Sequence, residues 1–364
     1  LQASGGEGPA AEEYAASLDA LGKNLRLRGD FTAAEALSRR ALEGRRALFG
    51  PRHAAVAESQ SNLAEALHEL GRFEGAEPLY TRALATRREL FGGRHLLVAE
   101  SLDQQALLWF NRGRVVDALG HYEEALEIRR ALLPEGHPQI AFATYHVGTV
   151  EQSLGRLEVA AEHLGRALEL FRRAYGEQHP RLALCLHDLG VLALSRGEPE
   201  EAEQFLRQAL DMRRRLFPGN HPDLVQSLGT LGSFAARRGQ LEAAGELLDE
   251  ALDRGRRLFS ETHPYVAITL LHLADVRLRG GDLAGAMALT REAIEGLEIS
   301  VGDDDLETWK ARSQLADFLW RSGDRGAARR LMLRVQAGFV RALGEDHELS
   351  RRAERWLEER QPSS

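Results

Sequence analysis

The sequence contains little of what several protein classes require. Cys185 is the single cysteine among 364 residues, so neither an intrachain disulfide nor a multi-thiolate metal site can form. The longest apolar run, residues 182–194, is interrupted by His187 and Asp188 and is shorter than the roughly 20 residues that a membrane-spanning helix needs. No signal-peptide pattern opens the chain. These absences predict a cytoplasmic protein that does not cross a membrane.

Lysine is almost absent as well. Only Lys23 and Lys310 are lysines among 47 basic residues, and this bias, together with abundant Ala, Leu and Gly, is typical of a GC-rich bacterial coding sequence. Acidic residues number 55, which gives a net charge of −8, whereas a domain that neutralises phosphates carries an excess of positive charge. The charge balance therefore argues against a nucleic-acid partner.

Sequence motifs of catalysis are also missing. The chain has no phosphate-cradling glycine loop, no His–Glu helix pair with metal spacing and no nucleophile elbow. Cys185 has small and apolar neighbours, which predicts a buried, inert thiol. Asp303, Asp304 and Asp305 are predicted to form a solvated turn, with cation binding as the alternative. We therefore expect a protein that is not an enzyme and that holds no cofactor or metal.

What the sequence does have is a period of 42 residues. A glycine, a small residue seven positions before it and an alanine five positions after it recur in eight registers. Such self-similarity is typical of solenoids, in which each repeat buries its apolar face against its neighbours. The glycines are Gly29, Gly71, Gly113, Gly155, Gly197, Gly239, Gly281 and Gly323, and the small residues are Gly22, Ala64, Ala106, Gly148, Gly190, Gly232, Ala274 and Ala316.

Each 42-residue unit is predicted to form two helices. In the sixth unit, apolar residues recur at helical spacing over 222–238 and again over 241–259, with Gly239 between them. The short connection favours antiparallel packing, and the fixed small residues allow the paired helices to approach without a Cβ clash. The sequence predicts an all-α array of eight units over residues 9–346, a capping helix at 347–360, and tails at 1–8 and 361–364, the first of them disordered.

A histidine recurs with the same period, each time just before a predicted helix, and the series has one gap. Several of these histidines are followed by proline, which is tolerated at the first helical position because the N–H there has no helical partner. We predict that they are turn and cap residues. A ladder of metal ligands is the alternative, but ligands must converge on one ion at about 2 Å, whereas stacked repeats hold equivalent atoms apart. The column comprises His53, His95, His137, His179, His221, His263 and His347, with Asp305 in the gap.

This repeat resembles the tetratricopeptide repeat in its 42-residue, kinesin-light-chain-like form. The resemblance rests on stretches such as SQSNLAEALHELGRFEGAEPLYTRALATRRELFG at 59–92 and GRVVDALGHYEEALEIRR at 113–130. It implies a right-handed α-α superhelix whose first helices line a concave groove for an extended peptide or partner protein. In the kinesin form an Asn of the first helix holds the peptide backbone. Only Asn62 matches that position, which argues against a role in motor-cargo transport.

The groove that the resemblance implies has a predicted polarity. Exposed positions of the first helices recur at intervals of four, three and four residues, and they change from acidic to apolar to basic along the chain. We expect the basic part of a peptide near the second unit and its acidic part near units six to eight. The alternative is that Phe142 and Leu184 pack between units and that the acids are a solvated face. The predicted groove residues are Glu58, Asn62, Glu65, Glu100, Gln104, Phe142, Tyr145, His146, Thr149, Leu184, Asp188, Val191, Arg237 and Arg279.

An arginine recurs near the end of the second helices. We expect each one to interact with the negative end of its helix dipole, for about 0.3–1 kcal/mol. All but Arg88 also have an acid three positions earlier within reach for an ion pair, namely Glu43, Glu127, Glu169, Asp211 and Asp253. The alternative is a surface for an acidic partner. The members are Arg46, Arg88, Arg130, Arg172, Arg214 and Arg256.

The sequence therefore predicts a non-catalytic scaffold for protein–protein interaction. The alternative is the sensor or substrate-recruiting region of a larger bacterial multidomain signalling enzyme, such as a Ser/Thr kinase or a protease-linked defence system. Its catalytic part would lie outside this chain, and the first residue, Leu1 rather than Met, favours that alternative.

Overall fold

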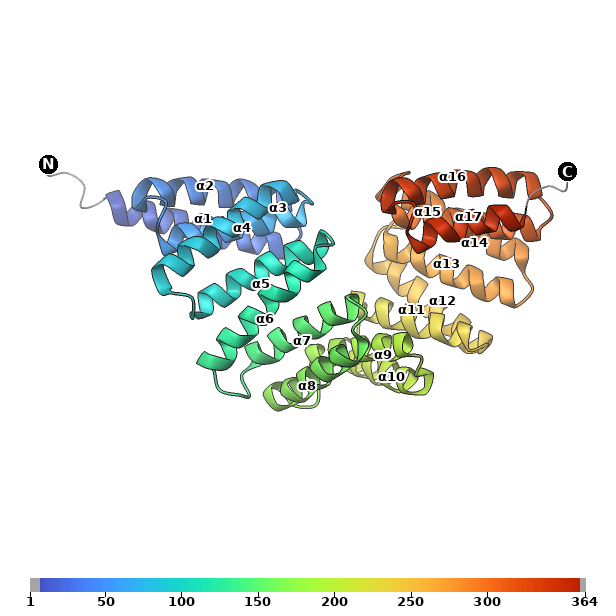
Figure 1. The fold of residues 1–364 in the computed structure, drawn as a ribbon, viewed down its shortest axis with the longest axis horizontal. Helices are drawn as coiled ribbons and strands as arrows, with labels where there is room; N and C mark the ends of the chain where they lie inside the picture. The colour runs from blue at the N-terminus through green and yellow to red at the C-terminus, as the bar shows by residue number, and fades with distance from the viewer. Residues whose placement is uncertain (1–6, 361–364) are drawn as a thin grey trace. The chain divides into compact units, whose positions relative to one another are not determined.

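The computed structural model describes residues 7–360, and every regular element in that range is an α-helix (Figure 1). The predicted all-α repeat fold is confirmed. No helix in this range has both the length and the apolar character needed to cross a bilayer. The helices are α1 (Glu7–Leu27), α2 (Phe31–Phe49), α3 (Ala54–Glu69), α4 (Phe73–Phe91), α5 (Leu96–Asn111), α6 (Val115–Leu132), α7 (Pro138–Ser153), α8 (Leu157–Tyr175), α9 (Pro180–Arg196), α10 (Pro199–Leu216), α11 (Pro222–Arg237), α12 (Leu241–Leu258), α13 (Pro264–Arg279), α14 (Leu283–Ser300), α15 (Leu306–Arg321), α16 (Arg325–Leu343) and α17 (Glu348–Glu359).

The ends of the array differ slightly from the sequence-based boundaries. Helix α1 begins at Glu7 rather than Pro9, and residues 1–6 of the expected disordered tail lie outside the described residues, as do residues 361–364. Helix α17, the expected capping helix, spans Glu348–Glu359.

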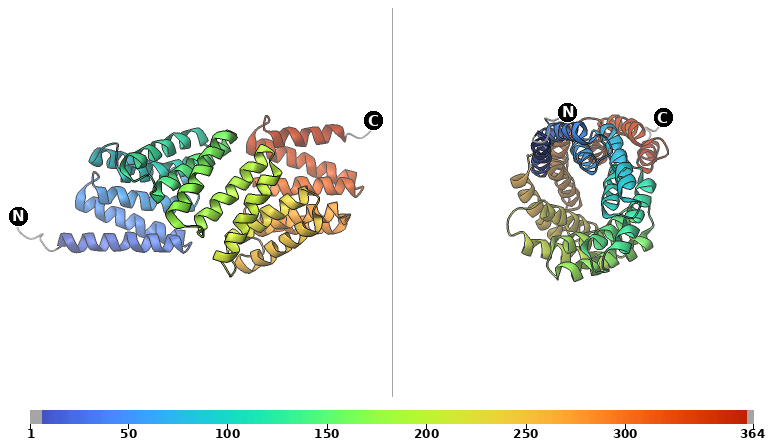
Figure 2. Two further views of the ribbon diagram at one scale, coloured as in Figure 1. Left: turned by 90° about the horizontal axis from the view of Figure 1, so that it is seen from below. Right: turned by 90° about the vertical axis from the view of Figure 1, so that its left-hand side faces the viewer.

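Within the described residues, the helices form two compact parts, residues 7–177 and 178–360. In each part the two helices of a unit pack on each other, and the second helix packs on the first helix of the next unit (Figure 2). First helices of successive units also contact one another, as α1 does with α3, α3 with α5 and α11 with α13. The first helices therefore form one side of each stack, which we call the inner face.

The fixed glycine of each unit has a backbone reason. All eight glycines of the column adopt positive φ, from 70° at Gly71 to 94° at Gly323, where the chain turns from the first helix to the second. A side chain disfavours this left-handed conformation, so glycine is the residue that the turn requires.

The fixed small residues of the first helices have a packing reason, as predicted. A Cβ on Gly190 would lie 2.7 Å from Cγ of Leu206, and one on Gly232 would lie 2.7 Å from Cγ of Leu248. These distances are shorter than any van der Waals contact, so only the missing Cβ lets the paired helices come this close.

The histidine column caps the first helices, as predicted. In each case Nδ1 accepts a hydrogen bond from the backbone N–H two residues later, for example at 3.1 Å from Leu97 to His95. Asp305 does the same for α15, through Oδ1 at 2.8 Å from the N–H of Glu307. Several of these rings also stack on an aromatic ring four residues earlier, as His221 does on Phe217. The column is thus a structural cap.

The arginines near the ends of the second helices join successive units. Arg88 pairs with Glu124 of the next second helix at 2.6 Å, and Arg214 pairs with Glu250 in the same way. The predicted pairing with an acid three positions earlier is therefore wrong for Arg214, because its guanidinium pairs with Glu250 of the next unit instead of Asp211.

The arginine one position earlier is buried instead. Arg45 donates to Oγ of Ser59 and to the carbonyl oxygen of Ala55, both at 3.0 Å, and Arg87 donates to Oγ of Ser101 at 2.7 Å. Arg213 repeats this arrangement with Ser227 in the second compact part. Each bond links a second helix to the first helix of the following unit.

Candidate functional site

The inner face of the first compact part begins with a network of opposite charges. Nζ of Lys23 on α1 lies 3.0 Å from Oε1 of Glu58 on α3, and Arg26 lies 3.0 Å from Glu65. Nε2 of Gln104 on α5 donates to the same Glu65 at 2.6 Å. The network connects three successive first helices, so it positions the predicted residues Glu58, Glu65 and Gln104 side by side.

Burial and charge act differently on the two glutamates. Burial raises the pKa of Glu65 above its usual value, although Arg26 and Gln104 lower it in part. Burial also acts to raise the pKa of Glu58, but the hydrogen bond and charge of Lys23, together with Arg45, lower it overall. Glu58 is therefore the more firmly ionised of the two groups.

The remaining predicted residues of α3 and α5 differ in accessibility. Asn62 is buried, with 6% of its surface exposed, so its side chain lies between helices rather than on an open surface. Glu100 is exposed. Leu107, one turn after Gln104 on α5, is 44% exposed, which makes it an apolar contact point on an otherwise polar face.

The predicted residues of α7 form an aromatic cluster with the neighbouring second helices. The ring of Phe142 meets Phe171 of α8 edge-on at 5.2 Å between centroids, and Tyr145 lies 6.3 Å from the same ring. His146 stacks on Tyr122 of α6 at 5.1 Å. All three side chains are half-buried. The contact of Phe142 with Phe171 joins the two helices of one unit, so it is not the packing between units that the sequence offered as the alternative.

Thr149 lies one turn beyond this cluster on α7. Its hydroxyl donates to the carbonyl oxygen of His146 at 2.9 Å, within the same helix. Its hydroxyl proton is therefore engaged within α7, and the half-buried side chain can offer a ligand a methyl group and a hydrogen-bond acceptor.

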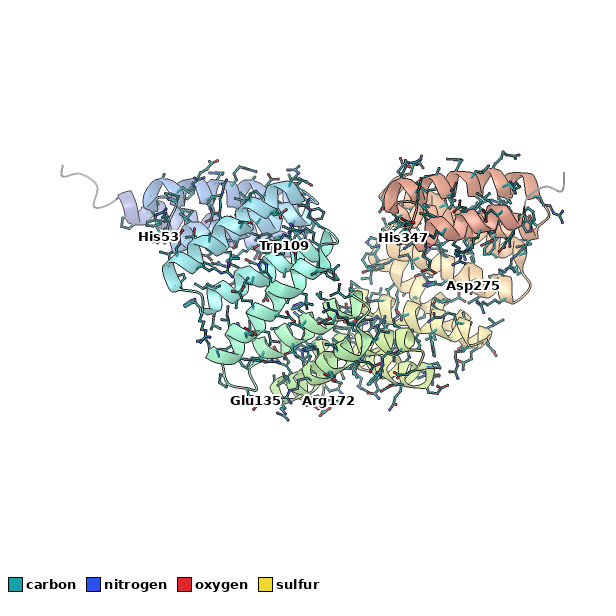
Figure 3. The ribbon with its side chains drawn as sticks, in the orientation of Figure 1. His53, Trp109, Glu135, Arg172, Asp275 and His347 are labelled. Atoms are coloured by element: carbon teal, nitrogen blue, oxygen red, sulfur yellow. The ribbon has the colours of Figure 1, made fainter. Side chains whose placement is uncertain are left out.

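The other predicted residues lie in the second compact part. Leu184, Asp188 and Val191 are half-buried on α9. Arg237 is exposed at the end of α11. Nε of Arg279 on α13 lies 2.7 Å from Asp275, one turn earlier on the same helix. The predicted basic end therefore contains carboxylates as well, and Figure 3 labels Asp275 among them.

No metal centre is evident on either part. Within residues 7–360, no group of three or more His, Cys, Asp or Glu side chains is placed to hold a metal ion. Cys185 is fully buried on α9, as the sequence predicted.

Comparison with protein families identifies the repeat. A tetratricopeptide-repeat model matches residues 13–89, 57–131, 139–215 and 223–299, and a second model of the same repeat matches residues 310–348. The chain belongs to the tetratricopeptide-repeat (TPR) family. The 42-residue spacing is kept throughout the TPR array, in agreement with the kinesin-light-chain-like form.

Solved structures of similar fold come from several kinds of protein. BtubC (BKLC) from P. vanneervenii is 29% identical, with a TM-score of 0.54 over 62% of this chain and 90% of that one. A Rap protein complexed with Competence and Sporulation Factor is 15% identical, with a TM-score of 0.54 over 96% of this chain and 98% of that one. A Signal Transduction ATPase with Numerous Domains (STAND) protein with a TPR sensor, from Pyrococcus horikoshii, is 15% identical, with a TM-score of 0.63 over 90% of this chain and 47% of that one. No curated protein matches the chain.

Two residues of the TPR inner face were missed by the sequence reasoning. Lys23 and Arg26 lie on α1 and neutralise much of the predicted acidic end. The 42-residue period contains the signal for one of them, because Lys23 stands 42 positions before Glu65. The predicted groove residues begin in the second unit, and the same positions in the first unit include this lysine.

Proposed function

We propose that this TPR chain is a non-catalytic scaffold that binds an extended peptide or a partner protein along its inner face. The observation that carries the proposal is the surface of α3 and α5, where exposed Leu107 lies among hydrogen-bonding and paired charged side chains. Such a surface supplies apolar burial for affinity and charged groups for orientation.

The charged network also favours an extended ligand over a compact one. Lys23, Glu58, Arg26 and Glu65 form a row of alternating sign across α1 and α3. An extended peptide with charges of both signs can replace the partners in these ion pairs without leaving a buried charge unpaired. The Rap protein of similar fold, which is complexed with Competence and Sporulation Factor, is in keeping with this role.

A matched pair of variants tests the proposal. Leu107→Asp places a charge on the inner face, whereas Val116→Asp does so at a 67% exposed position of the second helix α6. We expect a pull-down with the full chain, read by mass spectrometry, to lose its specific partners with Leu107→Asp and to keep them with Val116→Asp. If both variants retain the same partners while remaining folded, the inner face of the first part is not the binding surface.

A second candidate function is that of a sensor within a larger signalling protein. The observation that favours it is the STAND protein, whose TPR sensor has this fold and which is about twice as long as the matched segment. Fusion partners encoded next to this array would support that role, and binding through the inner face is common to both candidates.

A further inference from the structure

The last two units of the array enclose a hollow with a volume of about 340 Å³ on the inner face of the second compact part. It lies between α13, α15, α16 and α17, so the capping helix forms one of its walls. Part of its lining is apolar, namely Leu278, Phe318, Phe339 and Leu349. This volume is within the range of small-ligand pockets and suits one or two side chains of a peptide.

The rim of the hollow carries charges of both signs, but the acids already have partners. Oδ2 of Asp275 accepts a hydrogen bond from Nε of Arg279 at 2.7 Å, and Oδ1 of Asp317 accepts one from the indole N–H of Trp356. The ion pair neutralises Asp275, whereas Asp317 keeps its charge and has one oxygen occupied by the indole N–H.

Two of the three rim cations, by contrast, have unused capacity. Lys310 pairs with Glu307 at 2.7 Å. Arg321 on α15 and Arg352 on α17 line the hollow, and neither has a side-chain hydrogen bond or ion pair within residues 7–360. A guanidinium has five N–H donors in a planar fork that fits a carboxylate. Asp275 and Lys310 are paired, so Arg321 and Arg352 outnumber the charged Asp317 and give the rim an excess of positive charge.

We propose that this hollow receives an aspartate or glutamate side chain of a partner peptide, held by Arg321 and Arg352, together with an apolar neighbour on Phe318. The proposal rests on the peptide-binding role above and names the chemistry of one position of the ligand. Charge-assisted hydrogen bonds to guanidinium supply the specificity, and the apolar lining residues supply apolar burial.

A short synthetic peptide tests the proposal directly. The probe is acetyl-Gly-Leu-Glu-Leu-Gly-amide, which has a single side-chain carboxylate and no charged ends. Binding to the full chain is followed by the indole N–H signals of ¹⁵N-tryptophan, because Trp356 donates to the rim residue Asp317 and lies edge-on to Trp320. We expect a saturable shift of the Trp356 signal, and binding of the Gln analogue to be about tenfold weaker or more.

Three variants locate the contact. Arg321→Gln and Arg352→Gln should each weaken the Glu peptide about tenfold, because each removes one charged donor. Arg355→Gln removes the same charge from α17 at a position that does not line the hollow, and it should leave binding unchanged. The helical content of every variant is checked by circular dichroism.

Several outcomes would overturn the proposal. Equal binding of the Glu and Gln peptides, or stronger binding of a Lys analogue, would show that the rim does not select a carboxylate. Stronger binding of the Gln peptide with a free C-terminus would show that the hollow takes a main-chain carboxylate instead. The Leu107 test concerns the first compact part and a natural partner, so it can fail while this probe binds, and the reverse also holds.

Discussion

The indole of Trp309 on α15 lies against the α-carbon of Gly338 on α16. A Cβ on Gly338 would collide with the ring, and Trp309 is 4% exposed in a cluster with Val335, Phe339 and Trp356. The sequence of this unit matches the repeat less well than the others, because Val335 and Gly338 replace residues of the usual core pattern of the second helix. The structure shows a different packing solution, in which one missing side chain makes room for a large one.

Gly338→Ala should therefore destabilise the last unit. Overpacking against the indole costs about 1–3 kcal/mol, which exceeds the roughly 1 kcal/mol that alanine gains over glycine inside a helix. Gly245→Ala on α12 is the control, since nothing lies within 4 Å of the place that the added methyl group would occupy, and it should stabilise the chain. Urea unfolding followed by circular dichroism measures both, and a gain in stability from both substitutions would contradict the packing account.

The capping histidines should be replaceable by aspartate. His95→Ala removes the acceptor for the N–H of Leu97 and should cost about 1 kcal/mol of unfolding free energy. His95→Asp should recover much of that loss, because Asp305 caps α15 in the same register. Recovery will be incomplete if the stacking of His95 on Phe91 contributes. Thermal unfolding of the two variants measures the recovery. Equal losses of stability in His95→Ala and His95→Asp would argue against a capping role.

Acid should weaken the fold through His187. Burial, and then the charge of Arg213, lowers the pKa of this imidazole to about 4, well below its ordinary value of roughly 6.5. The folded state thus favours the neutral ring, so the stabilisation is present above the ordinary pKa and is lost as pH falls toward 4. The loss amounts to roughly 3 kcal/mol for this one group.

Comparison with His187→Leu isolates that contribution from other titrating groups, such as Asp103, whose pKa burial raises. The free energy of unfolding, measured in urea at pH 7 and pH 4, should fall more steeply in the parent chain than in the variant. Parallel pH profiles would show that His187 is accessible to protons in the folded state.

The buried arginines should contribute more than their exposed neighbours. Arg87→Leu removes the bond to Ser101 between the second and third units, whereas Arg88→Leu removes only an exposed ion pair with Glu124. We expect a loss of about 1–3 kcal/mol for the first and less than about 1 kcal/mol for the second. Unfolding free energies of the two variants test this, and a larger effect at Arg88 would reverse the assignment.

Regular features of the repeat could be predicted because each has a local cause. The turn glycines, the small residues at helix contacts and the histidine caps act within one unit and recur with the period. The period does not show which of two adjacent arginines is buried. Arg87 and Arg88 both recur with it, and consecutive residues of a helix point about 100° apart. Phe171 and Gly255 interrupt the series of buried arginines that contains Arg87. The series that contains Arg88 is more continuous, so the sequence draws attention to the exposed arginines instead.

The candidate site was predictable only in part for a related reason. Spacing placed Glu58, Glu65 and Gln104 on one face, and the structure brings them together. Spacing alone does not distinguish an exposed position from one that a neighbouring helix covers, as at Asn62. Nor does it identify a position that packs on an aromatic ring, as Phe142 does on Phe171. Those outcomes depend on side chains 29 or more residues away.

The bond from Arg45 to Ser59, repeated from Arg87 to Ser101, means that the modules of this protein are not interchangeable. Excising residues 92–133 would preserve the period but leave Arg87 opposite Ala143, which has no hydroxyl group to accept a hydrogen bond from the guanidinium. The order of the units thus depends on the hydrogen bonds between them. A shortened or shuffled array would need a serine opposite each buried arginine.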